Sequence, residues 1–377
     1  MASPKRRRKR RACVTGATGF VGAHVARALA ERGDRVRVAY RDPDRLDQLD
    51  ASEVEPVRAD VLDRRSMTEL LEGIDVLFHV AGYVGSSPVE RVWEMNAAAP
   101  RLAVEAAAAA GVSRVVLTST ISAIGPAQGV PADEGTFYPA GGLGLAYPDA
   151  KRQGEIEALE TAERTGVEVV IVNPAYVLGV PVNRSQAGET STRTVGNYLR
   201  GRLPAVVDAP MNFVDVEDAA EGHLLAAEHG RAGERYILGA ENMRWTEFVD
   251  RLARYSGRHY PLLVLPPEIH LIARARETAR LPGLIAAEGF ALMGQDWRFT
   301  SAKAARELGY APRSLEETMR ATIDWYEELM SAGAFEDEER SALSLAAAGL
   351  HTAGSLGLLS GLTLVQRLTG RRLVAGL

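Results

Sequence analysis

The sequence has almost no cysteine. Cys13 is the only one among 377 residues, so no disulfide can form within the chain. The absence of disulfides fits a reducing compartment. The basic start of the chain is not followed by the apolar core that a secretory signal needs. We therefore expect a cytoplasmic protein.

The chain also has fewer basic residues than acidic ones, 44 against 49, which gives a net charge of −5. Seven of the cations form the unbroken run Lys5–Arg11, and removing those seven charges leaves −12 for the rest of the chain. An acidic body argues against nucleic acid as the main partner. We expect residues 1–10 to be a solvated basic arm, with a nucleic-acid patch, a localisation signal and a membrane-surface anchor as open alternatives.

Charge is nearly absent near the end of the chain. Between Arg340 and Arg367 the only titratable side chain is that of His351. The segment is long enough to span a bilayer, but Gly, Ser, Thr and Ala dilute its apolar residues. We expect residues 336–377 to dock on the body or on a partner, or to extend from it. A membrane contact through this tail and a homodimer stay open as alternatives.

What is abundant is glycine, and its most informative placement is in Ala12–His24. A short apolar run there is followed by three glycines three residues apart, Gly16, Gly19 and Gly22, and then by a helical pattern. This predicts a strand, a tight turn and the first turn of a helix, whose free N–H groups suit the pyrophosphate of a dinucleotide. The spacing alone is weak evidence, since an ordinary turn has it too.

Strand and helix patterns then alternate through at least five rounds. The strands are predicted at Arg35–Tyr40, Val54–Arg58, Asp75–Val80, Arg114–Thr120 and Val167–Asn173. Arg35–Tyr40 alternates charged and apolar residues, whereas Asp75–Val80 is a nearly continuous apolar run, which is typical of parallel strands covered on both faces. The sequence therefore predicts an α/β fold with a doubly wound parallel sheet, followed by a smaller, mainly helical lobe.

Two groups of residues have the composition of a catalytic site. Tyr147 and Lys151 open a predicted helix after the long loop Gly125–Ala146, and their spacing of four places phenol and ammonium on one helical face. A nearby cation favours the ionised phenol. The hydroxyls of Thr118–Thr120 end a strand, and ligands bind at that edge of open parallel sheets.

In order and spacing, these segments resemble an extended short-chain dehydrogenase/reductase, and more narrowly the NAD-dependent epimerase/dehydratase family. The resemblance covers about residues 10 to 330 and also includes the segments Asp60–Val61, His79–Gly82, Asn173–Gly179 and Phe213–Asp218. Within the family, Tyr40–Pro43 and Gly233–Gly239 resemble the branch with dihydroflavonol-reductase-like carbonyl reductases and hopanoid-associated sugar epimerases.

The resemblance implies a Rossmann-type dinucleotide-binding domain at 11–180, to which later segments return, and a mainly substrate-binding lobe at 181–335. It implies Tyr147 as the general acid/base, Lys151 as its electrostatic helper and Thr120 as the hydroxyl that holds the substrate oxygen, with Ser119 as the fallback. Asn96 matches another recurring family position.

The cofactor-binding residues that it implies lie in the glycine-rich turn and after the strands of the predicted sheet. They are Gly16, Thr18, Gly19, Phe20, Val21, Gly22, Arg41, Asp60, Val61, Val80, Ala81, Gly82, Tyr147, Lys151, Pro174 and Val177. No metal ligands are predicted. The second strand ends in Tyr40-Arg41, and an arginine there accommodates the extra phosphate of NADP. Asp42 keeps NAD open, although Asp42-Pro43 reads more naturally as a turn.

The substrate is less well defined. Tyr83, Ser119, Tyr176, Arg193 and Asn212 are candidates from their positions alone. We expect a hydride transfer between nicotinamide and a small ketone, aldehyde or secondary alcohol. The alternative is a nucleotide-sugar epimerase or dehydratase with tightly bound NAD, for which Arg184, Arg193, Arg200 and Arg202 could supply cationic groups. A nucleotide-sensing protein without turnover is the remaining hypothesis.

Overall fold

The central sheet has seven parallel strands, as the alternating pattern predicts. The computed structural model describes residues 9–48, 54–139, 142–182, 190–278, 287–335 and 341–375. The strand order is β10-β6-β5-β4-β1-β2-β3, and every pair in it is parallel. The strands are β1 (Arg11–Thr15), β2 (Arg35–Tyr40), β3 (Val54–Arg58), β4 (Val76–His79), β5 (Arg114–Thr118), β6 (Glu168–Pro174) and β10 (Arg235–Leu238).

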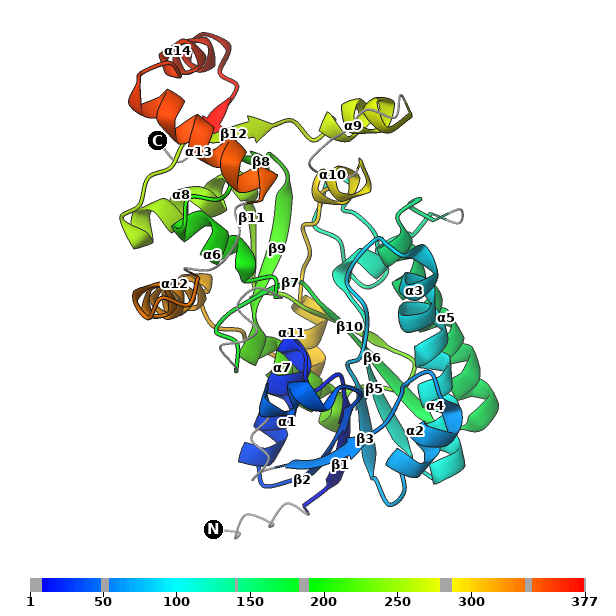
Figure 1. Ribbon diagram of the computed structural model, residues 1–377. Coiled ribbons are helices and arrows are strands. Elements are labelled where there is room, and N and C mark those ends of the chain that lie inside the picture. Colours follow the sequence, from blue (N-terminus) through cyan, green and yellow to red (C-terminus); the bar gives the residue numbers. More distant parts are fainter. Residues whose placement is uncertain are drawn as a thin grey trace, which may run out of the picture.

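Helices cover both faces of this sheet (Figure 1). On one face α1 (Phe20–Glu31), α7 (Val216–His229) and α11 (Ala302–Leu308) enclose a core that contains Val25, Leu224 and Leu308. On the other face α2 (Arg64–Leu70), α4 (Ala99–Ala110) and α5 (Ala146–Thr165) enclose a core that contains Leu70, Val104 and Ala158. The doubly wound architecture is therefore confirmed.

The helical segment that ends before Gly111 is divided into three parts. It consists of α3 (Val89–Trp93), a single wide π turn η2 (Glu94–Ala98) and α4. Such a turn commonly marks a functional site, because it displaces backbone groups from the regular ladder. Here it contains Asn96, which is completely buried. Two 3-10 turns, η1 (Pro43–Gln48) and η3 (Ile121–Ala123), follow β2 and β5.

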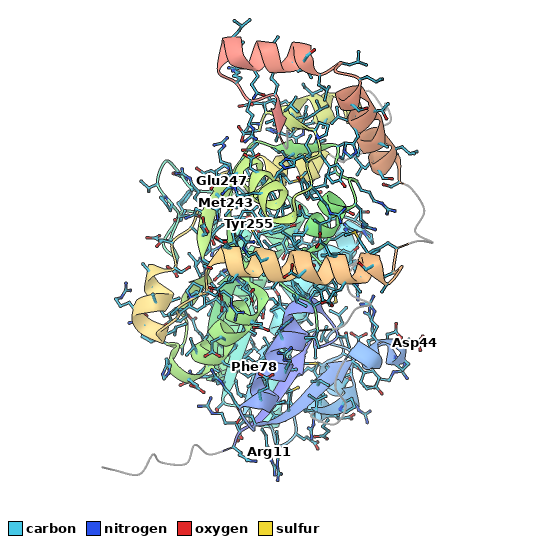
Figure 2. All side chains as sticks on the ribbon, turned by 90° about the vertical axis from the view of Figure 1, so that its left-hand side faces the viewer. Arg11, Asp44, Phe78, Met243, Glu247 and Tyr255 are labelled. Carbon is cyan, nitrogen blue, oxygen red and sulfur yellow. The ribbon has the colours of Figure 1, made fainter. Side chains whose placement is uncertain are left out.

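The second lobe is mainly helical but also contains two small sheets that the sequence pattern does not reveal. Their orders are β11-β9-β7 and β13-β12-β8. The strands are β7 (Tyr176–Leu178), β8 (Ala205–Val207), β9 (Pro210–Asp215), β11 (Glu241–Arg244), β12 (Leu262–Leu265) and β13 (Val374–Ala375). The helices α6 (Arg193–Leu199), α8 (Trp245–Ser256) and α12 (Leu315–Ser331) pack around a core that contains Phe213, Phe248 and Trp297. Figure 2 shows Glu247 and Tyr255 on α8, and Phe78 within the central sheet.

Two further pairs of helices, α9 (Ile269–Thr278) with α10 (Ala287–Met293) and α13 (Ala342–Ser355) with α14 (Ser360–Thr369), complete the second lobe. The tail docks on the body, because β13 pairs with β12 and His351 stacks on Tyr260 at 4.8 Å between ring centroids. Across the described residues, every helix is too short or too polar to span a bilayer.

Candidate active site

The glycine-rich turn between β1 and α1 is packed so closely that side chains cannot be accommodated. Gly16 has φ +71°, and a Cβ there would lie 2.7 Å from the backbone N of Ala81. A Cβ on Gly22 would lie 2.1 Å from the backbone O of Gly16, which places the helix directly against the turn. Gly19 caps the helix without a side chain. The first N–H groups of α1 are thus accessible to an anion such as a pyrophosphate, and the turn fits a dinucleotide.

The predicted cofactor residues meet at one edge of the sheet. The glycine-rich turn, Arg41, Asp60, Val80 and Pro174 follow or end β1, β2, β3, β4 and β6, which are all parallel. Parallel strands place their carboxyl ends on the same side, and ligands of open α/β sheets bind there. The residue set is therefore spatially consistent with one bound dinucleotide.

The end of β2 bears on the choice between NADP and NAD. Arg41 is exposed. The carboxylate of Asp42 accepts a hydrogen bond from the backbone N of Asp44 at 3.1 Å, at the start of η1. Asp42 therefore acts as a turn residue, in agreement with its sequence context beside Pro43.

The three residues predicted for catalysis meet where β5 ends and α5 begins. The hydroxyl of Thr120 lies near the phenol of Tyr147. The ammonium of Lys151 is buried and donates to the backbone O of Thr118 at 3.1 Å. Burial raises the pKa of Tyr147 to about 12, against the opposing effect of the Thr120 hydroxyl. Burial lowers the pKa of Lys151 to about 8, and the nearby Glu155 counteracts this. At neutral pH the phenol is therefore protonated beside a predominantly charged ammonium.

Asn96 fixes the loop that faces this group. Its side-chain O accepts from the backbone N of Tyr83 at 3.1 Å, and its side-chain N donates to the backbone O of Tyr83 at 2.8 Å. A Cβ on the neighbouring Gly82 would lie 2.9 Å from the Lys151 ammonium. A Cβ on Gly154 would lie only 2.0 Å from the backbone O of Asn96, so glycine at 154 lets α5 approach the π turn.

A buried carboxylate that the sequence does not single out, that of Glu155, is linked to the catalytic group through hydrogen bonds. Glu155 accepts from the side-chain N of Asn173 at 2.7 Å and pairs with Arg235 at 2.9 Å. Asn173 also donates to the backbone O of Thr120 at 2.9 Å. Burial raises the pKa of Glu155 to about 7, and the nearby Ser119 hydroxyl and the hydrogen bond from Asn173 oppose this effect. Its spacing of four from Lys151 was the available signal, because it places both side chains on one helical face.

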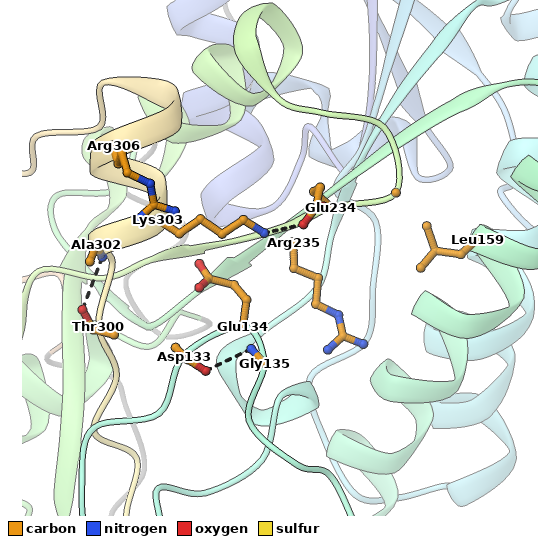
Figure 3. Close-up of a pocket in the computed structure, with 11 residues that line it drawn as sticks. Asp133, Glu134, Gly135, Leu159, Glu234, Arg235, Thr300, Ala302, Lys303 and Arg306 are labelled. Atoms are coloured by element: carbon orange, nitrogen blue, oxygen red, sulfur yellow. Dashed lines mark hydrogen bonds and ion pairs between the residues drawn. The ribbon is translucent and has the colours of Figure 1, made fainter.

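Arg235 links this carboxylate to a pocket of about 580 Å³ at the β10 edge of the sheet. Figure 3 shows this pocket, in which Lys303 pairs with Glu234 at 2.6 Å. Its other charged lining residues are Asp133, Glu134, Arg235 and Arg306. None of the residues predicted for catalysis or cofactor binding lines it.

His223 supports the site from the opposite face of the sheet. Its Nε2 is 2.8 Å from the hydroxyl of Thr118, and its Nδ1 is 2.6 Å from the backbone O of Ala219. Burial lowers its pKa to about 4. The neutral ring, with its proton on Nδ1, accepts from Thr118, whose own carbonyl holds Lys151.

Because His223 is held neutral, we expect it to lower the free energy of unfolding of the protein as the pH falls. Because its pKa is lower in the folded state than the ordinary 6.5, the unfolded chain takes up the proton first as the pH falls from about 6.5 to about 4. The free energy of unfolding of the wild type, minus that of His223→Gln, should therefore shrink by about 3 kcal/mol between pH 7 and pH 4. Urea titrations at the two pH values measure it.

The control is His229→Gln at the exposed end of the same helix, which should follow the wild type at both pH values. A constant difference between the wild type and His223→Gln would mean that His223 is not held neutral.

The predicted substrate residues fall into two groups. Tyr83 and Ser119 lie beside the group formed by Thr120, Tyr147 and Lys151. The phenol of Tyr83 donates to the backbone O of Ser87 at 2.8 Å. The other three residues lie in the second lobe. The phenol of Tyr176 is 2.9 Å from the Thr194 hydroxyl, and the side-chain N of Asn212 donates to the side-chain O of Asn242 at 2.8 Å. Arg193 is exposed at the start of α6. Tyr176 and Asn212 thus use polar groups to hold the lobe together.

The sequence predicts no metal ligands, and it offers four arginines for a nucleotide sugar: Arg184, Arg193, Arg200 and Arg202. Within the described residues, no group of three or more His, Cys, Asp or Glu side chains is placed to hold a metal ion. Of the arginines considered for a nucleotide sugar, Arg184 lies outside the described residues, and Arg200 lies over the Phe335 ring at 4.2 Å.

Comparisons with known proteins agree with this geometry. A model of the NAD dependent epimerase/dehydratase family matches residues 12–239. A putative dihydroflavonol 4-reductase of Synechocystis sp. is 33% identical over 83% of this chain and 94% of the relative. Sterol demethylase protein B of Methylococcus capsulatus is 32% identical over 84% of this chain and 98% of the relative. The crystal structure of gox2253 superposes with a TM-score of 0.74 at 32% identity, over 84% of this chain and 98% of that one.

Proposed function

The chain belongs to the NAD-dependent epimerase/dehydratase family, and from this premise we propose that it is an NADP-dependent reductase or dehydrogenase. Its substrate is a small, fairly apolar ketone or aldehyde, or the corresponding secondary alcohol. The observation that carries the proposal is the placement of the Tyr147 phenol and the Thr120 hydroxyl near each other beside the buried Lys151. A protein that only senses nucleotides has no need for such a proton donor.

Tyr147 is the proton donor of the proposed reduction. When bound, the nicotinamide supplies the hydride for the carbonyl carbon. Thr120 donates a hydrogen bond to the carbonyl oxygen, which holds the carbon in place and polarises the bond. Tyr147, whose pKa of about 12 keeps it protonated at neutral pH, transfers its proton to the same oxygen. The Lys151 ammonium then stabilises the Tyr147 phenolate. When the enzyme oxidises the alcohol instead, the phenolate oxygen takes the hydroxyl proton of the alcohol.

We propose NADP as the cofactor because Arg41 is exposed after β2 while the Asp42 carboxylate is bonded to the backbone of Asp44. Arg41→Ala should weaken NADPH binding by about tenfold and leave NADH binding within about twofold, since only NADPH carries the extra phosphate. Fluorescence titration with both reduced cofactors measures this.

The matched control is Arg35→Ala, which removes an exposed arginine from the opposite end of the same strand and should change neither affinity. A wild type that prefers NADH, or an Arg41→Ala variant with unchanged NADPH affinity, would refute the assignment of NADP.

The function itself is tested with a panel of ketones and aldehydes. The purified protein should consume NADPH, seen as loss of the absorbance of the reduced cofactor, with at least one small apolar carbonyl compound. No consumption across the panel, together with isomerisation of a nucleotide sugar, would instead favour the epimerase or dehydratase.

A further inference from the structure

Glu155 has no task in the proposed reduction, although its carboxylate is enclosed beside the groups that carry it out. The side chain lies in α5, one turn after Lys151, and is buried. A buried carboxylate is unfavourable unless other groups hold it. Its oxygens accept from the Asn173 side chain at 2.7 Å and pair with Arg235 at 2.9 Å and with Arg152 at 3.5 Å. These partners favour the ionised carboxylate.

Hydrogen bonds through one amide join this carboxylate to Thr120. The side-chain N of Asn173 donates to Glu155 at 2.7 Å and to the backbone O of Thr120 at 2.9 Å. Asn173 lies in β6 and is completely buried. Its amide cannot turn without losing both bonds, so the carboxylate helps to fix the residue whose hydroxyl holds the carbonyl oxygen in the proposed reduction.

The same carboxylate acts on the Lys151 ammonium through its charge. A spacing of four places both side chains on one face of α5. Burial lowers the pKa of Lys151, and the negative charge of Glu155 opposes this effect. The ammonium itself donates to a neutral acceptor, the backbone O of Thr118. The charge of Glu155 therefore helps to keep the buried ammonium protonated.

The other titratable groups near this pair are neutral in the range in which Lys151 titrates, apart from the two arginines that pair with Glu155. His79 of β4 faces Lys151, but burial lowers its pKa to about 3. The phenol of Tyr138, in the loop before α5, has a pKa that burial raises. Burial also raises the pKa of Tyr147, to about 12. Among these groups, the negative charge that acts on Lys151 is that of Glu155.

We propose that Glu155 is a positioning residue of the reduction, which stabilises the charged Lys151 ammonium and, through Asn173, holds Thr120 in place. This inference rests on the proposed function, because the ammonium and the Thr120 hydroxyl have their tasks only in that reaction. Arg235 of β10 balances the charge of the carboxylate, which allows an anion to persist in a buried position.

The titration of Lys151 tests this proposal directly. The chain contains four lysines, Lys5, Lys9, Lys151 and Lys303, so the full-length protein labelled with ¹³C-lysine gives few side-chain NMR signals. The signal of Lys151 is the one that Lys151→Arg lacks. In the wild type it should titrate near pH 8. In Glu155→Gln, which keeps the shape of the side chain and removes its charge, it should titrate at least about one pH unit lower.

Glu155→Asp keeps the charge but shortens the side chain. The titration of Lys151 should return to within about half a pH unit of the wild type. The kcat should stay about tenfold reduced, because the shorter carboxylate no longer reaches Asn173 and Thr120 is held less well. Thermal unfolding checks that each variant is folded. If Glu155→Gln does not fold, Glu155→Gln/Arg235→Gln replaces it, since the double variant leaves no unpaired arginine.

The matched control is Glu157→Gln, which removes a carboxylate of the same helix that pairs with Arg101 at 3.3 Å. It should change neither the titration of Lys151 nor turnover. An unchanged titration in Glu155→Gln overturns the proposal, with or without turnover, and a wild-type kcat in Glu155→Asp overturns the link to Thr120. A shifted titration in a protein that consumes no NADPH with any carbonyl compound supports the action of Glu155 on Lys151 and overturns the proposed reduction instead.

Discussion

A Tyr147→Phe variant is expected to turn over carbonyl substrates about 10²–10⁴-fold more slowly than the wild type. Phenylalanine keeps the half-buried ring and removes only the hydroxyl that lies near Thr120. The carbonyl oxygen then has no proton donor, whereas the glycine-rich turn that receives the dinucleotide is untouched. Steady-state kinetics should show the loss in kcat, and NADPH titration should give an affinity within about twofold of the wild type.

Tyr255→Phe is the control for this substitution. Tyr255 lies in α8 of the second lobe, with the Arg320 guanidinium 4.3 Å from its ring centroid, and its hydroxyl has no part in the proposed reaction (Figure 2). Its turnover should equal that of the wild type. Turnover retained in Tyr147→Phe would remove Tyr147 from the role of proton donor.

Gly22→Ala is expected to abolish dinucleotide binding and to destabilise the fold by about 3 kcal/mol or more. The added Cβ would lie 2.1 Å from the O and 2.6 Å from the C of Gly16, which are backbone atoms that cannot rotate away. To relieve this contact α1 must move off the end of β1, and its first N–H groups then no longer face the turn. Urea unfolding and NADPH titration measure the two effects.

A suitable control is Gly111→Ala, at the end of α4. Gly111 has a left-handed φ of +74°, unlike Gly22 within α1, but a Cβ there would meet no atom within 4 Å. This variant should lose only about 1 kcal/mol from the left-handed backbone and should bind NADPH like the wild type. If Gly22→Ala bound NADPH with unchanged affinity, the dinucleotide would have to bind elsewhere.

The features that the sequence predicts correctly are those whose structure depends on residues close together in the chain. The five strands predicted after the glycine-rich turn belong to the central sheet, and their boundaries agree with the structure to within two residues. Tyr147 and Lys151 meet because one helix carries both, at a spacing that needs no tertiary information. The same reasoning applies to the turn between β1 and α1.

The partners of these residues could not be predicted, because they come from distant segments. His223 reaches Thr118 across 105 residues, and Asn173 joins the loop of Thr120 to Glu155 in α5. The strands of the second lobe escape the pattern because most have two to four residues, too few for an alternation to appear. Tyr176 and Asn212 lie in the expected lobe, but only the structure shows that their polar groups are bonded within it.

The most direct test of the account is to follow the hydrogen itself. The wild type is incubated with a carbonyl substrate from the panel and with NADPH deuterated at the transferred position of nicotinamide C4. Mass spectrometry should find one deuterium on the carbinol carbon of the product, and Tyr147→Phe should form this product at least about 10²-fold more slowly. Alcohol formed without deuterium, or formed equally fast by Tyr147→Phe, would contradict a hydride transfer coupled to proton donation by this phenol.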